Sequence, residues 1–268
     1  MNYENAGSYA FGGFKDDDNE LDRLIKQAKI ALPAEMDLLK QRGLKKGMNV
    51  LDLASGPGVV SCAIGEEVLP GQVLGVDISA ELVGVASSYA QEQRTTNVEF
   101  ENQDVYSLDV GEGQFDFAYA RFLFQHMQYP LKALANIKKA LKPGGRLLIT
   151  DVDDDWLTLS SDDGTFKRFT ELAHSGQKTQ GGDRLIGRKL APLLEQADFK
   201  DIDVGILLFT DKHFSMETFL NITTGFKREQ IVGVPEGEVN AMLEDIYAQS
   251  KRPYCWGYVG VFTVVGTV

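Results

Sequence analysis

The chain has 268 residues, of which 43% are hydrophobic, enough for one large hydrophobic core with a modest cap. Its 39 acidic and 27 basic residues give a formal net charge of −12. Proteins that bind DNA or RNA need a basic surface, because neutralising phosphates supplies most of their affinity, so this charge disfavours nucleic acid as a partner. Neither end carries a long apolar stretch, so we expect neither secretion nor a membrane span.

The cysteines and the acidic residues form no disulfide or metal-binding pattern. Cys62 lies in an apolar helical segment and Cys255 beside the last predicted strand, where both are expected to be packing residues. The acids at 153–155 lack the spacing of a calcium loop and are interpreted as a solvated turn, so no metal is assigned. With no signal segment expected, these features predict a cytoplasmic protein.

Residues 1–48 predict a helical extension ahead of the core. Apolar residues recur at helical spacing from Leu21 to Leu32, and Pro33 interrupts this pattern before a second helix that ends near Gln41. We expect this extension to form part of a lid over a ligand site.

Residues 49–58, Asn-Val-Leu-Asp-Leu-Ala-Ser-Gly-Pro-Gly, predict a buried strand and a tight turn, and a helix follows from Val59. Gly56 and Gly58 lack a Cβ, so the backbone can approach a ligand closely and offer it free N–H groups at the helix N-terminus. The next strand ends in Asp77, about twenty residues further on, where a carboxylate can accept hydrogen bonds from both hydroxyls of a ribose. The pattern predicts a cofactor that contains a nucleoside.

Two classes of cofactor use this layout. The dinucleotide fingerprint is Gly-x-Gly-x-x-Gly, and here the frame from Gly56 reads Gly-Pro-Gly-Val-Val-Ser, so Ser61 stands in place of the third glycine. The glycines alone therefore disfavour NAD without excluding it.

Strands alternate with helices through the first half of the chain. The strands are expected near residues 50, 74, 99, 117 and 147, with helices over 59–69, 80–94 and 131–141. This alternation predicts an α/β fold, a Rossmann-like doubly wound and mostly parallel sheet. Ligands of such sheets bind at the carboxyl ends of the strands, where Gly56, Asp77, Asp104 and Arg121 fall.

Five segments in this order resemble the motifs of class I S-adenosylmethionine-dependent methyltransferases. They are Val50–Gly58, Asp77-Ile78-Ser79, Phe100–Val105, Phe115–Ala120 and Leu141–Ile149. The resemblance implies S-adenosyl-L-methionine as cofactor, with S-adenosyl-L-homocysteine as product, and a seven-stranded sheet whose last strand is antiparallel.

The same resemblance assigns cofactor-binding residues. The first motif supplies Asp52, Ala54, Ser55, Gly56 and Gly58, with Ala54 in the place of the usual first glycine. In the second motif, Asp77 is expected on the ribose and Ile78 against the adenine. In the third, Asp104 is expected to accept from the adenine amino group, beside Val105.

Two segments depart from the simple alternation and are expected to be insertions, at 152–184 and 211–252. The core would then consist of the cofactor-binding half, 49–151, a helix and strand in 185–210, and a final strand in 253–268. We expect the insertions to cap the cofactor site and exclude water from it. The alternative is that their helices only cover sheet edges or form the contact of a homodimer.

Looser motifs resemble a bacterial subgroup of small-molecule methyltransferases. Tyr9-Ala-Phe-Gly12 precedes a helix with Glu20, Arg23 and Gln27, and Arg121 is followed by His126 after the fourth strand. The subgroup has diverse substrates, so the resemblance implies a small-molecule methyl acceptor without naming it.

Methyl transfer is an in-line displacement, in which the enzyme chiefly aligns donor and acceptor. A base is needed only for an acceptor that arrives protonated, and His126 is the candidate because histidine titrates near neutrality. The alternative is that His126 orients the loop or packs under the cap.

Several side chains are candidates for the methionine end of the cofactor. Arg121 could bind its carboxylate or an acidic substrate, or pair with a nearby acid; Arg23 and Gln27 could reach the carboxylate if the first helix folds over the site, or face solvent. Tyr9 belongs to a set of aromatic residues that would suit an apolar or cationic acceptor.

Three functions remain open from the sequence. The first is a methyltransferase that acts on a small-molecule metabolite. The second is a non-catalytic S-adenosylmethionine-binding or sensor protein, and the third is an NAD-dependent Rossmann dehydrogenase. Binding of S-adenosylhomocysteine rather than NAD would exclude the dehydrogenase, and turnover would exclude the sensor.

Overall fold

The computed structural model describes residue 8 and residues 17–268, and its centre is a seven-stranded sheet of order β3-β2-β1-β4-β5-β7-β6. The strands are β1 (Val50–Leu53), β2 (Val73–Asp77), β3 (Val98–Asn102), β4 (Phe115–Arg121), β5 (Leu141–Leu159), β6 (Lys200–Thr210) and β7 (Gly257–Thr267). Strands β1 to β5 are parallel, and β7 runs antiparallel between β5 and β6. The predicted fold, including the antiparallel last strand, is confirmed.

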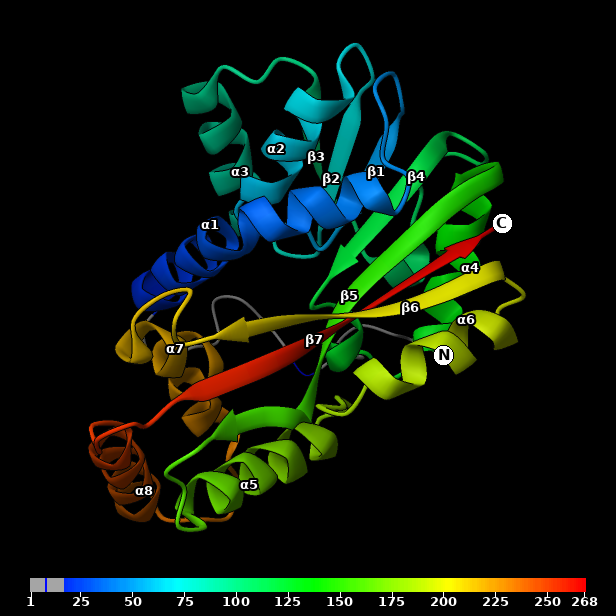
Figure 1. Ribbon diagram of the computed structural model, residues 1–268. Helices are drawn as coiled ribbons and strands as arrows, with labels where there is room; N and C mark the ends of the chain where they lie inside the picture. Colours follow the sequence, from blue (N-terminus) through cyan, green and yellow to red (C-terminus); the bar gives the residue numbers. More distant parts are fainter. Residues whose placement is uncertain (1–7, 9–16) are drawn as a thin grey trace.

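Helices cover both faces of this sheet (Figure 1). They are α1 (Asp17–Gln41), α2 (Val59–Val68), α3 (Ala80–Gln93), α4 (Pro130–Ala140), α5 (Thr165–Thr179), α6 (Leu190–Gln196), α7 (Met216–Thr223) and α8 (Glu236–Ser250). Short 3-10 turns are η1 (Val105–Ser107), η2 (Phe124–His126), η3 (Gly187–Lys189) and η4 (Gly225–Gln230). Successive strand residues face opposite sides, so Val50 packs in the core under α1 and α2, and Leu51 in the core under α4 and α6.

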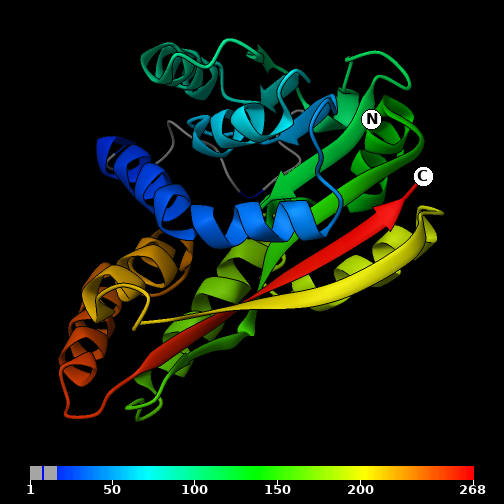
Figure 2. The same ribbon diagram turned by 45° about the horizontal axis from the view of Figure 1, so that its top comes forward.

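The N-terminal helix differs from its prediction. The sequence predicts two helices separated at Pro33, but α1 is one helix that contains Pro33. Proline removes one backbone donor and crowds the preceding turn, which bends a helix without ending it when packing holds both parts. Figure 2 shows that α1 is bent, and its far end reaches α7.

Strand β5 is much longer than predicted and continues to Leu159, through the start of the expected insertion at 152–184. Its register with β7 shifts between Val152 and Leu157, and the pair extends beyond the parallel strands (Figure 1). Here Leu157 packs in a third hydrophobic core with side chains such as Phe169 of α5, Phe219 of α7 and Ile246 of α8. We call α5, α7, η4 and α8 the cap. The third hydrophobic core joins side chains from both predicted insertions, 152–184 and 211–252.

Residue 8 and residues 17–268 contain neither a membrane-spanning helix nor a group of side chains that could bind a metal. Within this part of the chain, no helix is both long and apolar enough to cross a bilayer. In the same part, no group of three or more histidine, cysteine or acidic side chains is placed to hold a metal ion. Both cysteines are free thiols, and Cys255 contacts Ser161 Oγ at 3.0 Å.

Candidate cofactor and acceptor site

A cavity of about 700 Å³ lies at the carboxyl ends of the parallel strands. One end is lined by the glycine turn and the ends of β1, β2 and β4, and we call it the cofactor half. The other end is lined by the cap, the distal parts of β5, β6 and β7 and the side of α1, and we call it the cap half. A volume of this size suits small-molecule ligands.

The glycine turn presents one glycine to the cavity and uses the other for packing. Gly56 lines the cavity at a φ of 54°, and a Cβ there would meet nothing within 4 Å. Gly58 has a φ of 79°, and a Cβ there would lie 2.8 Å from Phe100 and 2.9 Å from Ala86. Gly58 therefore lets the start of α2 pack closely against α3 and β3, and it is not among the residues that line the cavity.

Ala54 occupies the position where the resemblance expects a glycine, and it has a φ of 56°. An L-residue in this left-handed region carries about 1–2 kcal/mol of strain. The turn thus keeps the glycine-like backbone despite the methyl group, and Ala54 lines the cavity beside Ser55.

Asp77 is oriented by two backbone donors. Its Oδ2 accepts from Gly56 N at 3.0 Å and its Oδ1 from Ser79 N at 2.9 Å. Burial raises the pKa of this carboxyl above its usual value, although these hydrogen bonds oppose the shift. Next to it, Ile78 is 65% exposed and lines the cavity, so its apolar side chain is accessible to a ligand there.

The third motif adds a second oriented carboxylate. Asp104 Oδ1 accepts from Tyr106 N at 2.8 Å at the start of η1, and both Asp104 and Val105 line the cavity. The structure thus gathers the residues of all three motifs on one side of the same cavity.

Asp52 lies under the turn and is almost fully buried. Its Oδ2 accepts from Ser61 Oγ at 2.5 Å, and burial raises the pKa of the Asp52 carboxyl to about 7. A cationic group of a ligand beside it would stabilise the charged carboxylate. Ser55 Oγ is also buried, and it has no hydrogen-bond partner among the residues that the structure describes.

Arg121 pairs with an acid that the sequence analysis did not single out. Its Nε donates to Oε1 of Glu35, on α1, at 2.6 Å, and its guanidinium lies 4.5 Å from the ring centroid of Phe122. The ion pair attaches α1 to the end of β4. Arg121 Nη2 is buried without a partner in the described part of the chain, and this donor is available to an anionic ligand group.

His126 lines the cavity, but it is not the near-neutral titrating group that the sequence predicts. Its Nδ1 lies 3.0 Å from Ser8 Oγ and 3.4 Å from Gln177 Nε2. Burial, with added repulsion from Arg184 and Arg23, lowers the pKa of His126 to about 3. The ring is therefore neutral at physiological pH, and its protonated form is unfavourable.

Arg23 and Gln27 both reach the cavity from α1. The Arg23 guanidinium makes two hydrogen bonds to Glu20, at 2.6 and 2.7 Å, and one to Gln27 at 3.2 Å. It also lies 4.4 Å from the ring centroid of Phe226 in the cap. Neither side chain belongs to a solvated face. Tyr9 lies outside the described residues.

The cap half contains charged residues that the sequence analysis missed. Asp154 is buried and accepts from Arg184 Nε at 2.9 Å, from Arg184 Nη2 at 3.0 Å and from Lys227 Nζ at 2.8 Å. We call Asp154, Arg184 and Lys227 the cap ion cluster. The prediction of a solvated turn at 153–155 is wrong for Asp153 as well, because it is fully buried and bonded to Arg188 at 2.6 Å.

Comparison with known proteins identifies the class. A family described as "Methyltransferase domain" matches residues 44–198, more than half of the chain. The chain belongs to this family, the class I S-adenosylmethionine-dependent methyltransferases, and its cofactor is S-adenosyl-L-methionine.

Individual relatives agree with this class. An O-methyltransferase, cnsE, of Penicillium expansum is 30% identical over 207 residues, which cover 74% of this chain and 67% of the relative. An uncharacterized 37.1 kDa protein in transposon TN4556 of Streptomyces fradiae is 35% identical over 159 residues. That match covers 58% of this chain, which spans only 44% of that relative. The crystal structure of a SAM dependent methyltransferase from Aquifex aeolicus shares the fold, with a TM-score of 0.54 and 24% identity over 71% of this chain and 91% of that one.

Proposed function

We propose that the protein transfers a methyl group from S-adenosylmethionine to a small-molecule acceptor. The observation that carries this proposal is the single cavity that joins the three cofactor motifs to the cap half. The formal charge of −12 favours a small molecule over nucleic acid as the acceptor. The name of the Penicillium relative, an O-methyltransferase, favours transfer to oxygen.

The cofactor half offers a partner for each part of the nucleoside. Asp77 is held with its carboxylate at the end of β2, where it would accept from the ribose hydroxyls. Ile78 and Val105 supply apolar surface for the adenine. Asp104 would accept from the adenine amino group.

The methionine end of the cofactor fits the buried polar atoms under the turn. The Asp52 carboxylate would bind the ammonium group, which would also lower the pKa of Asp52 from about 7. Ser55 Oγ and Arg121 Nη2 would donate to the carboxylate, which gives both buried atoms a partner.

When bound, the cofactor supplies a methyl group that its sulfonium already activates. The residues of this chain have to align donor and acceptor and exclude water. The Glu35–Arg121 ion pair fixes α1 beside the cavity, and Arg23 on Phe226 fixes α1 to the cap. We propose that α1 and the cap act together as a lid. His126 remains the candidate base, but a pKa of about 3 makes it a weak one.

Two calorimetric titrations and one assay test the function. We expect S-adenosylhomocysteine to bind and NAD not to bind, because Ser61 replaces the third glycine and donates to Asp52. NAD binding without S-adenosylhomocysteine binding would support the dehydrogenase. Binding of S-adenosylhomocysteine without turnover of any acceptor would support the sensor.

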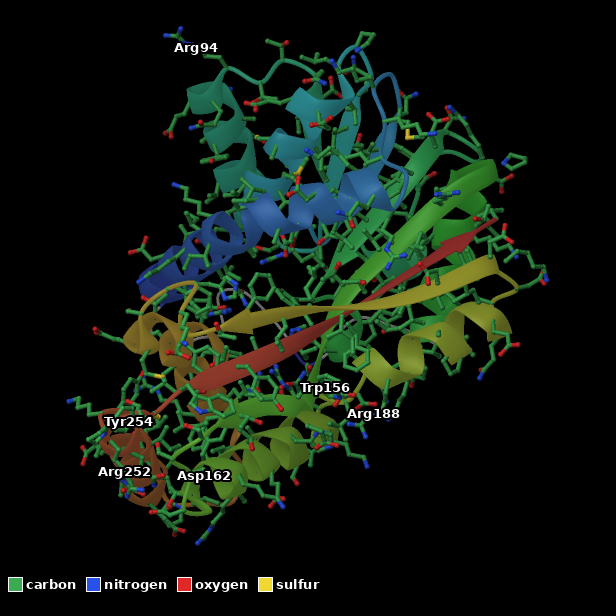
Figure 3. The ribbon with its side chains drawn as sticks, viewed as in Figure 1. Arg94, Trp156, Asp162, Arg188, Arg252 and Tyr254 are labelled. Carbon is green, nitrogen blue, oxygen red and sulfur yellow. The ribbon has the colours of Figure 1, made fainter. Side chains whose placement is uncertain are left out.

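We also propose that the protein is a cytoplasmic homodimer that associates through β6. Val204, Ile206 and Leu208 alternate along this edge strand and are 49%, 40% and 53% exposed. Trp156, labelled in Figure 3, extends this apolar surface and packs against Phe262 of β7 with ring centroids 5.6 Å apart. Light scattering should show a dimer that Ile206→Lys converts to a monomer; a monomeric wild type at high concentration would contradict the proposal.

A further inference from the structure

Lys227 is a fully buried ammonium group with unused donors. It lies on η4 and lines the cap half of the cavity. Among the described residues, its ammonium group has one hydrogen-bonded partner, Asp154 Oδ2 at 2.8 Å. A lysine ammonium has three N–H donors, so two are available to a ligand.

The cap ion cluster carries one excess positive charge. Arg184 and Lys227 share the single carboxylate of Asp154. An uncompensated charge is costly to bury, so the cluster is incomplete without an anion. Burial indeed lowers the pKa of Lys227 to about 8, although Asp154 opposes the shift.

In the described part of the chain, two other nearby acids are bonded elsewhere. Asp151 is near Arg184, but its carboxylate accepts from the backbone N–H of Gln125 and Val152, and burial raises its pKa to about 7. The carboxylate of Glu20 accepts hydrogen bonds from both Nε and Nη2 of Arg23. Among the described residues, no carboxylate other than Asp154 is hydrogen-bonded to Lys227, so a ligand anion can take its unused donors.

The same surroundings disfavour a cationic acceptor. The guanidinium groups of Arg23 and Arg184 lie 4.4 and 5.7 Å from the ring centroid of Phe226, so this aromatic face already interacts with cations. The positive potential extends to His126, whose pKa both arginines lower. Of the two classes of acceptor that the aromatic residues suggested, apolar and cationic, these surroundings favour the apolar one.

Apolar side chains line the rest of the cap half. They are Leu157, Phe209, Phe214, Ile222, Val259 and Val261. Gln230 Oε1 also lies there, buried and without a partner among the described residues, and would accept from a ligand donor. The site thus fits a molecule with an apolar body and one charged end.

We propose that the methyl acceptor is an apolar small molecule with a carboxylate, and that this carboxylate binds Lys227 in the cap ion cluster. The inference rests on the proposed function, because it takes the cap half as the acceptor site. One excess positive charge matches a singly charged carboxylate. Since the anion binds the charged form of Lys227, its affinity should fall as the pH rises above about 8.

Three matched probes test the inference by calorimetry with S-adenosylhomocysteine bound: 2-naphthoate, 2-naphthamide and 2-naphthylmethylamine. Wild type should bind 2-naphthoate about 10- to 100-fold more tightly than the other two. Lys227→Met should remove this preference. Arg228→Met removes a charge from the exposed side of the same turn and should retain it.

The same titrations separate this inference from the proposed function. Failure of wild type to bind S-adenosylhomocysteine would contradict the proposed function itself. With S-adenosylhomocysteine bound, equal affinity for the three probes, or no binding of 2-naphthoate, would overturn the carboxylate site alone. A retained preference in Lys227→Met would do the same. If thermal unfolding shows that Lys227→Met does not fold, Lys227→Gln, which keeps a donor for Asp154, replaces it with the same expected loss.

Discussion

The carboxylates of the second and third motifs and the carboxylate of the cap ion cluster are held by different means. In the cofactor half, Asp77 is bonded to backbone N–H groups of Gly56 and Ser79, and Asp104 to that of Tyr106. These donors are neutral and belong to turns at the ends of strands. Loss of one carboxylate there leaves an N–H group that water in the open cavity can reach.

In the cap half, the carboxylate is held by charged side chains from distant segments. Asp154 binds Arg184, 30 residues away, and Lys227, 73 residues away. Loss of this carboxylate would leave two buried cations without a counter-charge. The difference therefore predicts that substitution of Asp77 or Asp104 mainly affects ligand binding, whereas substitution of Asp154 mainly affects stability.

Asp154→Asn should have the largest effect on stability. We expect the free energy of unfolding to fall by about 3–5 kcal/mol, as when one partner of a buried ion pair is removed. Asp155→Asn is the control, because its carboxylate is 62% exposed and is paired with the exposed side chain of Arg188, and it should change stability by less than about 1 kcal/mol. Chemical denaturation measures both. Equal small losses would show that the cap ion cluster is not a buried network.

Two glycine variants sharpen the comparison within the cofactor half. Gly56→Ala and Gly58→Ala carry similar strain from a positive φ, but only the Cβ at 58 meets Phe100 and Ala86. We expect Gly58→Ala to lose about 1–3 kcal/mol more stability than Gly56→Ala. Gly56→Ala should instead weaken S-adenosylhomocysteine binding. The reverse pattern in thermal unfolding and calorimetry would contradict the assigned roles.

Asp77→Ala tests the ribose site. S-adenosylhomocysteine binding should weaken by about 1.5–3 kcal/mol, because the variant lacks the acceptor for the ribose hydroxyls. Asp109→Ala, which removes an exposed carboxylate, is the control and should bind as wild type does. A folded Asp77→Ala protein with unchanged affinity would show that the nucleoside binds elsewhere.

His126→Asn should have its clearest effect at acid pH. The pKa of His126 is lowered from 6.5 to about 3 in the folded protein, so the unfolded chain binds an extra proton between these values. The contribution of the neutral His126 ring to the stability of the folded protein is therefore full above pH 6.5 and is lost as the pH falls toward 3. The variant should lose less stability than wild type over this range. If the free energy of unfolding fell equally with pH in the two proteins, the pKa of His126 would be the same in the folded and the unfolded chain.

The sequence predicts the cofactor half well because its determinants are local. A strand, a glycine turn and a helix start are contiguous in residues 49–59, and parallel strands necessarily bring Asp77 and Asp104 to the same edge. The same logic gives the parallel direction of the strands but not their length. Strand β5 continues to Leu159 only because β7 pairs with it there.

The cap half could not be predicted in the same way. Asp154, Arg184 and Lys227 lie in three segments without a shared motif, and each alone has the composition of a surface turn or helix. Their meeting depends on how the two insertions pack. Likewise, the pKa of His126 depends on burial and on two arginines that only the tertiary structure brings near it.

A turnover assay tests the central claim most directly. The protein would be incubated with S-adenosylmethionine and with pools of apolar carboxylates, their amides and their amines, and S-adenosylhomocysteine would be measured by mass spectrometry. The account predicts S-adenosylhomocysteine together with a methylated product from the carboxylate pool. S-adenosylmethionine binding without methylation in any pool would contradict the proposal that this cavity catalyses methyl transfer to an apolar small molecule.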